Sequence, residues 1–369
     1  MPILEKSSSH RRRLGDFLAG LLLVALLGGI VWLWWHARHP EKISRHKTAA
    51  PAVSLIPVVK PAAKPEIKPI IHPIVIEPST AAEFPRPVRD GLEAQVALAR
   101  RAISPGSLDA AIGSQTRAAI AAFQRSQHLS ETAGLDTNTR PALTLDAPLL
   151  TNYPVTTNDL ARLQPLGKTW LAKSEQTALD YETILELVAE TAHAHPVLIQ
   201  KLNPGVNWTN VSAGTMVKIP AVNYPEPAEP AAFVVIHLSG KYLEAFGAET
   251  NLLLHCPCSI AAKVEKRPVG ELHVAVVAPH PNYTFDPAVF PESPEAQAIG
   301  RKLILPPGPN NPVGVAWIGL DKPGYGMHGT PVPEQVGRTE SHGCFRLANW
   351  DAEYLLKLVW VGLPVDVVP

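Results

Sequence analysis

Tyr325-Gly326-Met327-His328-Gly329-Thr330 is followed, after a short polar insert, by Ser341-His342-Gly343-Cys344-Phe345-Arg346-Leu347. A thiolate, and not a thiol, attacks carbonyl carbons, and a nearby imidazole can generate it near neutral pH. Glycines let backbone N–H groups approach a reacting oxygen closely. This combination of cysteine, histidine and glycine predicts a thiolate nucleophile. The alternative is a buried cysteine in a glycine-rich loop with two incidental histidines.

The two elements resemble the catalytic domain of the L,D-transpeptidase family, also called the YkuD domain. Members of that family carry a histidine in an HG(T/S) element, then SHGC followed by an apolar residue and Arg or Asn. Both elements are present here in that order, near the C-terminal end of the chain, with His328 and Cys344 sixteen positions apart. The pairing of the two elements argues against the incidental alternative.

The resemblance implies that Cys344 is the nucleophile and that His328 is the base that accepts its proton. The family assigns the base to the HG element and not to the histidine beside the cysteine. Adjacent side chains in a tight turn tend to point apart, which also favours His328. The second histidine, His342, is then expected to shape the pocket or the catalytic loop together with Ser341.

The resemblance also assigns roles to two backbone groups. Gly329 matches the position whose carbonyl orients the catalytic imidazole, and such an acceptor decides which ring nitrogen faces the sulfur. The N–H groups of Gly343 and Cys344 are candidates for an oxyanion hole, in which one donor contributes roughly 3 kcal/mol to transition-state stabilisation.

Three further side chains near these elements are candidates for substrate binding. Arg346 stands where the family has Arg or Asn, and a guanidinium holds a carboxylate through two hydrogen bonds. Its alternative role is an ion pair with Asp351 or Glu340. Trp317 and Tyr325 are expected to line the cleft, unless they are simply packed in the core.

The composition limits the other classes of function. The chain has 369 residues, enough for two or three domains, and its 33 basic and 33 acidic residues argue against a strongly basic nucleic-acid binder. Three cysteines are too few for a disulfide scaffold. Cys256-Pro257-Cys258 contains either two free apolar cysteines or a strained disulfide, and Cys-X-Cys alone does not indicate a metal site.

The sequence of the N-terminal region predicts a membrane anchor. Residues 17–35, FLAGLLLVALLGGIVWLWW, lack charge and are close to the length of a bilayer span, and tryptophans gather at one end. No small-residue cleavage site follows, so an uncleaved signal anchor is expected in place of a cleaved signal peptide. Basic residues flank both ends equally. The orientation, with residues 1–16 in the cytoplasm, is therefore taken from the expected location of the substrate.

Residues 36–88 are expected to form a linker. Proline recurs every three to five residues, which favours extended polyproline II structure over a helix. Such a tract reaches on the order of 100 Å or more, enough to hold a catalytic domain away from a bilayer. The alternative is a tract that binds a partner.

Two modules are expected between the linker and the catalytic domain. Residues 89–148 resemble the peptidoglycan-binding domain 1 family, a three-helix module, although Asp109-Ala110 replaces its usual Asp-Gly. Residues 150–223 resemble a LysM module more weakly: a first helix at 184–190, a second ending in Leu202-Asn203-Pro204-Gly205, and a closing strand at 214–220. Whether either module binds glycan, or serves only as a spacer, is left open.

Residues 230–369 contain short β-branched runs with polar breaks, which predict strands at 233–238, 242–246, 252–256, 272–277 and 364–368, and a brief helix at 351–358. This pattern agrees with the mostly-β sandwich of the YkuD fold. The fold class is therefore multidomain α+β: a transmembrane helix, a Pro-rich linker, a helical module, a LysM-like α/β module and a mostly-β catalytic domain.

The resemblance implies an enzyme that acts on peptidoglycan without a cofactor. Together with the apolar run at 17–35, it leads us to expect a protein anchored in the inner membrane with its catalytic domain in the periplasm, and no metal site is assigned. Cys344 would attack the third residue of a tetrapeptide stem, release the terminal D-alanine, and pass the acyl group to an amine of a neighbouring stem. Water or a lipoprotein lysine are alternative acceptors. A non-catalytic wall-binding scaffold is the alternative from another class, and nucleic acid is not an expected partner.

Overall fold

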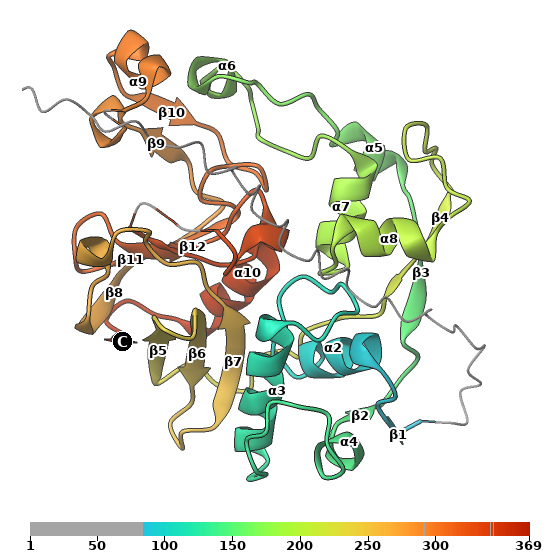
Figure 1. Ribbon diagram of the computed structural model, residues 1–369. Helices are drawn as coiled ribbons and strands as arrows, with labels where there is room; N and C mark the ends of the chain where they lie inside the picture. Colours follow the sequence, from blue (N-terminus) through green and yellow to red (C-terminus); the bar gives the residue numbers. More distant parts are fainter. Residues whose placement is uncertain (1–83, 291, 340, 342) are drawn as a thin grey trace, which may run out of the picture. The chain divides into compact units, whose positions relative to one another are not determined.

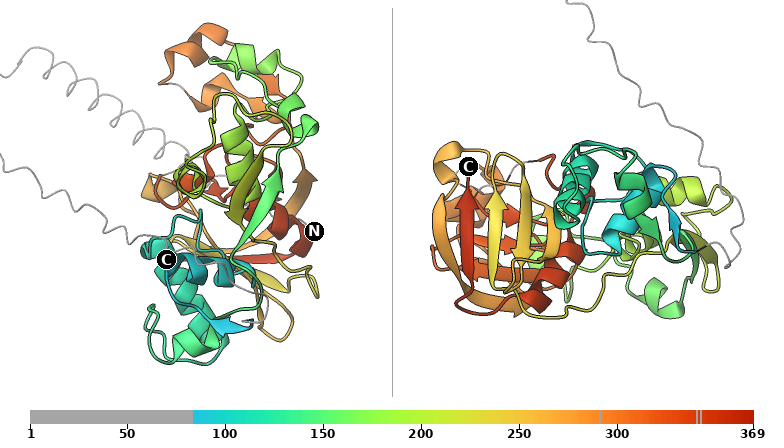
Figure 2. Two further views of the ribbon diagram at one scale, coloured as in Figure 1. Left: turned by 90° about the vertical axis from the view of Figure 1, so that its right-hand side faces the viewer. Right: turned by 90° about the horizontal axis from the view of Figure 1, so that it is seen from below.

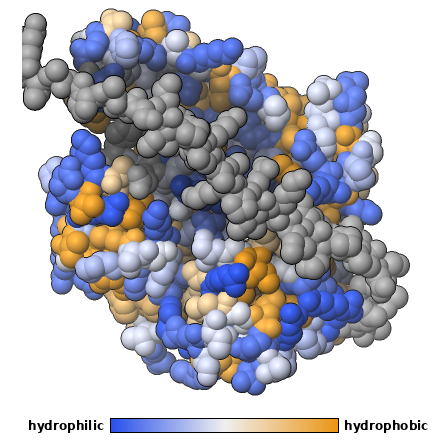
Figure 3. Space-filling model, in the orientation of Figure 1, coloured by the Kyte–Doolittle hydropathy of each residue, from blue (hydrophilic) through white to orange (hydrophobic). Residues whose placement is uncertain are grey.

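The computed structural model describes residues 84–290, 292–339, 341 and 343–369 (Figure 1). The expected anchor at 17–35, most of the expected linker and His342 lie outside these residues. Among the residues that are described, no helix has the length and apolar character needed to cross a membrane. Hydrophilic and hydrophobic residues are interspersed over the face seen in Figure 3.

Residues 84–148 form a small helical domain. Asp90 caps its first helix by accepting a hydrogen bond of 2.9 Å from the N–H of Glu93. Ala110, where the related family has glycine, adopts a left-handed φ of +69°, so the local backbone has the conformation that glycine favours. The elements are β1 (Arg86–Pro87), α2 (Gly91–Ala99), α3 (Ser114–Ser126), α4 (Thr139–Ala142) and β2 (Thr144–Leu145).

The helical domain begins earlier than its sequence indicated. Residues 86–87 were expected in the linker because of their prolines, but they form β1, which pairs antiparallel with β2 in a two-stranded sheet. The guanidinium of Arg86 also donates to both carboxylate oxygens of Glu93, at 2.6 and 2.7 Å. The linker boundary at residue 88 is therefore wrong, because tertiary pairing holds these residues in the domain.

Residues 150–220 form an α/β module. The helices expected at 184–190 and after His195 and the strand expected at 214–220 are confirmed. Thr183 and Glu186 form a capping box at the start of the first of these helices, and Pro196 occupies the first turn of the second. The elements are β3 (Leu150–Pro154), α5 (Thr157–Ala161), α6 (Trp170–Ser174), α7 (Ile184–Thr191), α8 (Pro196–Leu202) and β4 (Met216–Pro220), and β3 pairs antiparallel with β4.

The C-terminal region is built on an eight-stranded sheet in the order β13-β12-β11-β8-β14-β5-β6-β7. Two pairs, β12 with β13 and β14 with β5, are parallel, and the remaining pairs are antiparallel. The strands are β5 (Phe233–His237), β6 (Tyr242–Phe246), β7 (Leu252–Pro257), β8 (Gly270–Pro279), β11 (Ala316–Leu320), β12 (Gly326–His328), β13 (Phe345–Arg346) and β14 (Pro364–Val368). The five expected strands are confirmed.

A helix and a separate lobe complete this region. The expected C-terminal helix is α10 (Asn349–Leu358), which contributes Leu355 and Leu358 to the core of the sheet. The lobe follows β8 and contains β9 (Tyr283–Phe285), η3 (Pro287–Val289), α9 (Pro294–Ile299) and β10 (Leu303–Leu305). Cys256 and Cys258 are free and fully buried in the core, as expected of two apolar cysteines.

The helical domain covers the edge of the sheet. The N–H of Ser104 donates to the carbonyl of His255 on β7 at 2.7 Å, and the N–H of His255 donates to the carbonyl of Ala102 at 3.0 Å. Seen from below, α3 lies alongside β7 (Figure 2). The edge strand is thus paired instead of being left open for association with another chain.

A buried carboxyl group lies at this junction. Asp351 of α10 is fully buried and accepts hydrogen bonds from the hydroxyls of Tyr224, at 2.6 Å, and Ser104, at 3.1 Å. Burial raises the pKa of this carboxyl to about 7, and the two hydroxyl donors oppose that shift. Ionisation of Asp351, at the junction between the helical domain and the catalytic region, therefore destabilises the folded protein near neutral pH.

We expect Asp351→Asn to change the pH dependence of stability. Because the folded pKa is raised, the contribution of Asp351 is fully present below its unfolded pKa of 3.8 and is lost as the pH rises through about 7. The total loss is at most about 4 kcal/mol at 1.36 kcal/mol per pKa unit. Thermal unfolding midpoints between pH 4 and pH 8 should fall for the natural protein and fall less for the variant. Equal slopes for both proteins would contradict this expectation.

Candidate active site

Six of the predicted site residues line one cleft of about 440 Å³. The cleft lies where β11, β12 and β13 meet the loop that precedes β13. Its lining includes these six residues: Trp317, His328, Ser341, Gly343, Cys344 and Arg346.

The ladder of the sheet explains why three of these side chains are neighbours. His328 on β12 lies opposite Trp317 on β11 and opposite Arg346 on β13. Directly paired residues of adjacent strands project from the same face of a sheet. The indole and the imidazole stack with their ring centroids 5.7 Å apart. Strand pairing thus assembles the residues from segments far apart in the sequence.

The imidazole of His328 is oriented for proton transfer. Its Nδ1 lies 2.7 Å from the carbonyl oxygen of Gly329, the contact that the family resemblance implied. A carbonyl only accepts hydrogen bonds, so Nδ1 carries the proton and Nε2 is left as the basic nitrogen. Burial lowers the pKa of His328 to about 4, so the ring is neutral at pH 7. A neutral imidazole is the form that can act as a general base.

The thiol of Cys344 is partly enclosed. Its Sγ lies 3.4 Å from the carbonyl oxygen of Gly324. Burial raises the pKa of the thiol, whereas the backbone of Gly326 and the positive charge of Arg346 oppose that rise. The cleft therefore contains a neutral thiol and a neutral imidazole, and the thiolate forms only when a proton leaves the sulfur.

The loop before β13 is closed by its own hydrogen bonds. The hydroxyl of Ser341 donates to the carbonyl of Cys344 at 2.5 Å, and the N–H of Gly343 donates to the same hydroxyl at 3.3 Å. Ser341 is buried and therefore shapes the loop that presents the sulfur. The oxyanion roles of Gly343 and Cys344 remain predictions.

Two family models match this chain. Residues 231–367 match the L,D-transpeptidase catalytic domain, and residues 90–143 match a family described as "Putative peptidoglycan binding domain". The chain contains an L,D-transpeptidase catalytic domain. The match begins before β5, ends within β14, and includes both sequence elements that carry His328 and Cys344.

Named relatives agree with this assignment. The "Putative L,D-transpeptidase YkuD" of Bacillus licheniformis is 27% identical over 188 residues, covering 51% of this chain and 94% of that protein. The "Probable L,D-transpeptidase YbiS" of Escherichia coli is 27% identical over 184 residues, covering 46% and 55%, so the chain spans about half of that relative. A solved L,D-transpeptidase from Mycobacterium smegmatis is 19% identical, covers 43% of this chain and 76% of that chain, and has a TM-score of 0.30.

Arg346 of the L,D-transpeptidase domain lines the cleft, where its positive charge can bind an anionic group. Among the residues that the structure describes, its guanidinium forms no ion pair, and Asp351 is held by Tyr224 and Ser104. The alternative of an ion pair with Asp351 is therefore wrong, because Asp351 is buried at the junction with the helical domain. Glu340, the other suggested partner, lies outside the described residues.

We expect Arg346→Gln to slow alkylation of Cys344. Loss of the neighbouring positive charge removes one of the groups that lower the pKa of the thiol, so the pKa should rise and the thiolate fraction at pH 7 should fall several-fold. Rates with iodoacetamide between pH 6 and pH 10 measure this shift, since the other two cysteines are fully buried. Arg338→Gln, which removes a charge that is ion-paired with Asp109, is the matched control. An unchanged pH profile in Arg346→Gln would exclude the charge effect.

Tyr325 is placed differently from the expectation. It is not among the residues that line the cleft, and its ring packs against the core of the sheet with the ammonium of Lys322 5.1 Å from its centroid. Its ring edge nevertheless lies 4.0 Å from the position that a Cβ on the cleft residue Gly343 would occupy, so a role of Tyr325 in substrate binding stays a prediction. Trp317 lines the cleft.

Asn349 is a positioning residue that sequence reasoning missed. Its Oδ1 accepts from the N–H of Thr330 at 3.0 Å, two positions after His328. Its Nδ2 donates to the carbonyl of Pro309 at 3.2 Å and to Glu190 of α7 at 3.0 Å. A Cβ on Gly314 would lie 2.0 Å from Oδ1, so only glycine permits this approach. No motif marks the residue, because its partners come from three separate segments.

Sequence reasoning also missed the apolar wall of the cleft. Four of these residues belong to the lobe that follows β8 or to the loop that leads from it into β11, and one belongs to the α/β module. Their spacing in the sequence carries no motif, so no sequence signal pointed to them. They are Tyr283, Val289, Phe290, Val313 and Trp170. In the described residues, no group of three or more His, Cys, Asp or Glu side chains is arranged to hold a metal ion.

Proposed function

We propose that this L,D-transpeptidase uses Cys344 as nucleophile and His328 as base to form 3→3 crosslinks in peptidoglycan. The observation that carries the proposal is the contact between His328 Nδ1 and the Gly329 carbonyl, in the cleft that also contains Cys344. That contact leaves Nε2 free to accept a proton. The family matches support an acyl transfer on peptidoglycan stems.

The proposed reaction consists of two acyl transfers. His328 Nε2 takes the proton of the Cys344 thiol while the sulfur attacks the carbonyl of the third stem residue. The N–H groups of Gly343 and Cys344 stabilise the oxyanion, and the imidazolium returns its proton to the amine of the departing D-alanine. An amine of a neighbouring stem then attacks the thioester, gives its proton to His328, and releases the thiol. No cofactor takes part in these steps.

The acceptor is the part of the proposal with real alternatives. Water as acceptor would make the chain an L,D-carboxypeptidase, and a lipoprotein lysine would make it an anchoring enzyme. Incubation with disaccharide-tetrapeptides, followed by mass spectrometry, separates these outcomes. Crosslinked dimers are the expected product; tripeptides alone indicate hydrolysis, and unchanged substrate would favour a wall-binding scaffold.

We further propose that residues 90–143 and the LysM-like module bind peptidoglycan and hold the catalytic domain against its substrate. The family match of residues 90–143 supports the first of these, and the second is based on the resemblance of residues 150–223 to a LysM module. Co-sedimentation of the protein with purified, insoluble peptidoglycan tests this. Recovery of all the protein in the supernatant would exclude wall binding.

We propose that residues 17–35 anchor the enzyme in the inner membrane with the catalytic domain in the periplasm. The support is the uncharged apolar run, its terminal tryptophans and the absence of a small-residue cleavage site. Sequencing the N-terminus of membrane-extracted protein tests whether the anchor is retained. Protease treatment of spheroplasts tests whether the catalytic domain is in the periplasm. A mature N-terminus near residues 36–50, or protection from external protease, would contradict the topology.

A further inference from the structure

A segment of the α/β module extends away from the rest of that module and packs on the catalytic domain. Residues 162–182, between α5 and α7, extend to the lobe that contains β9, β10 and α9, and α6 lies beside that lobe in Figures 1 and 2. The two parts share an apolar core that is separate from the two larger cores. Its fully or nearly fully buried members are Leu179, Phe285, Ala296, Leu303 and Leu305.

Trp170 is the main aromatic contact of this segment. Its indole stacks on Phe285 with the ring centroids 4.5 Å apart and the planes inclined by 18°, and on Phe290 at 5.9 Å. The backbone N–H of Trp170 also donates to the carboxylate of Glu295 on α9 at 2.5 Å. Stacked aromatic contacts of this kind add about 0.5–1.5 kcal/mol to the burial of the rings. The indole is therefore held in one position relative to the lobe.

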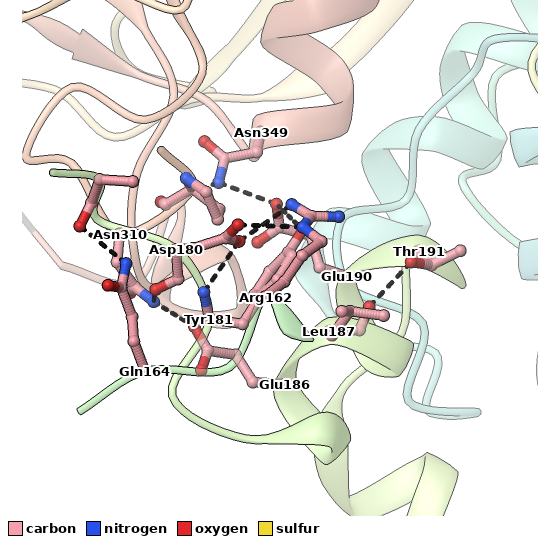
Figure 4. Close-up of polar contacts among 12 residues, drawn as sticks. Arg162, Gln164, Asp180, Tyr181, Glu186, Leu187, Glu190, Thr191, Asn310 and Asn349 are labelled. Carbon is pink, nitrogen blue, oxygen red and sulfur yellow. Dashed lines mark hydrogen bonds and ion pairs between the residues drawn. The ribbon is translucent and has the colours of Figure 1, made fainter. Parts of the chain in front are cut away.

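Polar contacts fasten the other end of the segment (Figure 4). The N–H of Leu179 donates to the carbonyl of Pro307, and the N–H of Asn310 donates to the carbonyl of Leu179, both at 2.9 Å. The side chain of Asn310 donates to the carbonyl of Asp180 at 3.0 Å and to Glu186 of α7 at 2.5 Å. Each of these partners belongs to a different fold unit from its donor, so the segment is tied to the catalytic domain at two points.

Glycine permits the closest of these approaches. Gly308 has a φ of +144°, and a Cβ at this position would lie 2.2 Å from the carbonyl oxygen of Leu179. Any side chain here would push the segment away from the catalytic domain. Gly308 does not line the cleft of Cys344, so it offers a way to displace the segment without altering the cleft directly.

Trp170 also forms part of the catalytic cleft. It lines the space that contains Cys344 and His328, and it lines a neighbouring pocket of about 410 Å³ together with Lys173 and Thr330. Arg346 reaches both spaces. The indole of Trp170 therefore lines both the cleft and the neighbouring pocket, as Arg346 does. Each space thus has an apolar ring and a positive charge in its lining.

We propose that Trp170 is a substrate-positioning residue, supplied to the cleft by the docked segment 162–182. Its indole packs against an aliphatic group of the acyl donor, while Arg346 faces a carboxylate of the same molecule. The ligand class that fits is a peptide with a small apolar side chain beside a free carboxylate. The identity of the acyl donor in this inference rests on the proposed function. The placement of Trp170 in the cleft is independent of the proposed function.

The test compares Trp170→Ala, Trp170→Phe and Leu171→Ala in the 369-residue chain. Leu171 is 39% exposed and does not line the cleft, so its variant is the matched control. With disaccharide-tetrapeptide, Trp170→Ala should raise KM about 10-fold or more while kcat changes less than about 3-fold, since loss of apolar contact area in a pocket costs 10- to 200-fold in discrimination. The Phe and Leu171 variants should stay near the natural protein. An unchanged KM in Trp170→Ala would overturn the proposal.

A substrate-independent measurement separates this inference from the proposed function. Removal of the indole should widen the cleft and raise the ratio of Cys344 alkylation rates with N-phenylmaleimide and iodoacetamide several-fold. If the natural protein does not turn over tetrapeptide, the proposed function fails, whereas a raised ratio in Trp170→Ala still supports the placement of Trp170 in the cleft. An unchanged ratio contradicts that placement.

Displacement of the segment gives an independent variant. Gly308→Ala should reproduce the effect of Trp170→Ala on KM and on the alkylation ratio, and the double variant should show little further change, because both substitutions remove the same surface. Circular dichroism verifies that each variant is folded. A folded Gly308→Ala protein with natural KM and natural alkylation ratio would show that docking of the segment does not form the wall.

Discussion

Cys344→Ser should abolish acyl transfer and leave the fold intact. A hydroxyl is far less acidic than a thiol, and an imidazole whose pKa is about 4 is too weak a base to activate it. We expect turnover to fall by roughly 10³-fold or more, the scale seen when a nucleophile is removed from other covalent enzymes. Mass spectrometry of tetrapeptide products gives the rate.

The control for this prediction uses a cysteine outside the cleft. Cys256→Ala removes a fully buried thiol from the core of the sheet and should keep turnover near that of the natural protein. Circular dichroism of both variants shows that neither is unfolded. Natural turnover by a folded Cys344→Ser protein would remove Cys344 from the mechanism and, with it, the proposed thioester.

His328→Ala should lower acyl transfer by roughly 10²- to 10⁴-fold, the usual contribution of a general base. The structure offers the physical reason: Nδ1 is held by the Gly329 carbonyl, burial keeps the ring neutral, and Nε2 is the basic nitrogen. The neutral imidazole of His328 is the active form, and it predominates above about pH 4. The natural enzyme should therefore lose activity as the pH falls through about 4. The pH profile of kcat/KM between pH 3.5 and pH 8 measures this.

Alkylation of Cys344 at pH 7 separates His328 from its alternative, His342. His328→Ala should slow the reaction with iodoacetamide, and Cys258→Ala should not, because that thiol is fully buried. If His328→Ala leaves the alkylation rate unchanged, another group takes the proton, and His342→Ala is the next variant to measure.

Local sequence carried most of the information about the proposed nucleophile and base. His328 ends a short strand and Cys344 directly precedes another, and the Gly329 carbonyl is adjacent to the ring that it orients. Contacts between neighbouring residues depend on local backbone conformation, which a short motif specifies. The helices and strands were predictable for the same reason, because periodic apolar positions and capping residues act within a few residues.

The walls of the cleft could not be predicted in this way. Trp170 lines the cleft that contains Cys344 only because residues 162–182 pack on the lobe after β8. Asn349 reaches Thr330 only because Gly314 allows a close approach. Neither contact has a spacing that sequence could reveal.

The sequence by itself located the proposed nucleophile and base and most of the helices and strands of the described residues. Only the tertiary structure decided that Arg346 lines the cleft instead of pairing with Asp351, that Tyr325 packs against the core of the sheet, and that Trp170 lines the cleft that contains Cys344. The physical reason is the range of the forces involved: motifs and periodicity record interactions between near neighbours in the chain. Packing between distant segments depends on the shape of both surfaces, which exists only in the folded protein.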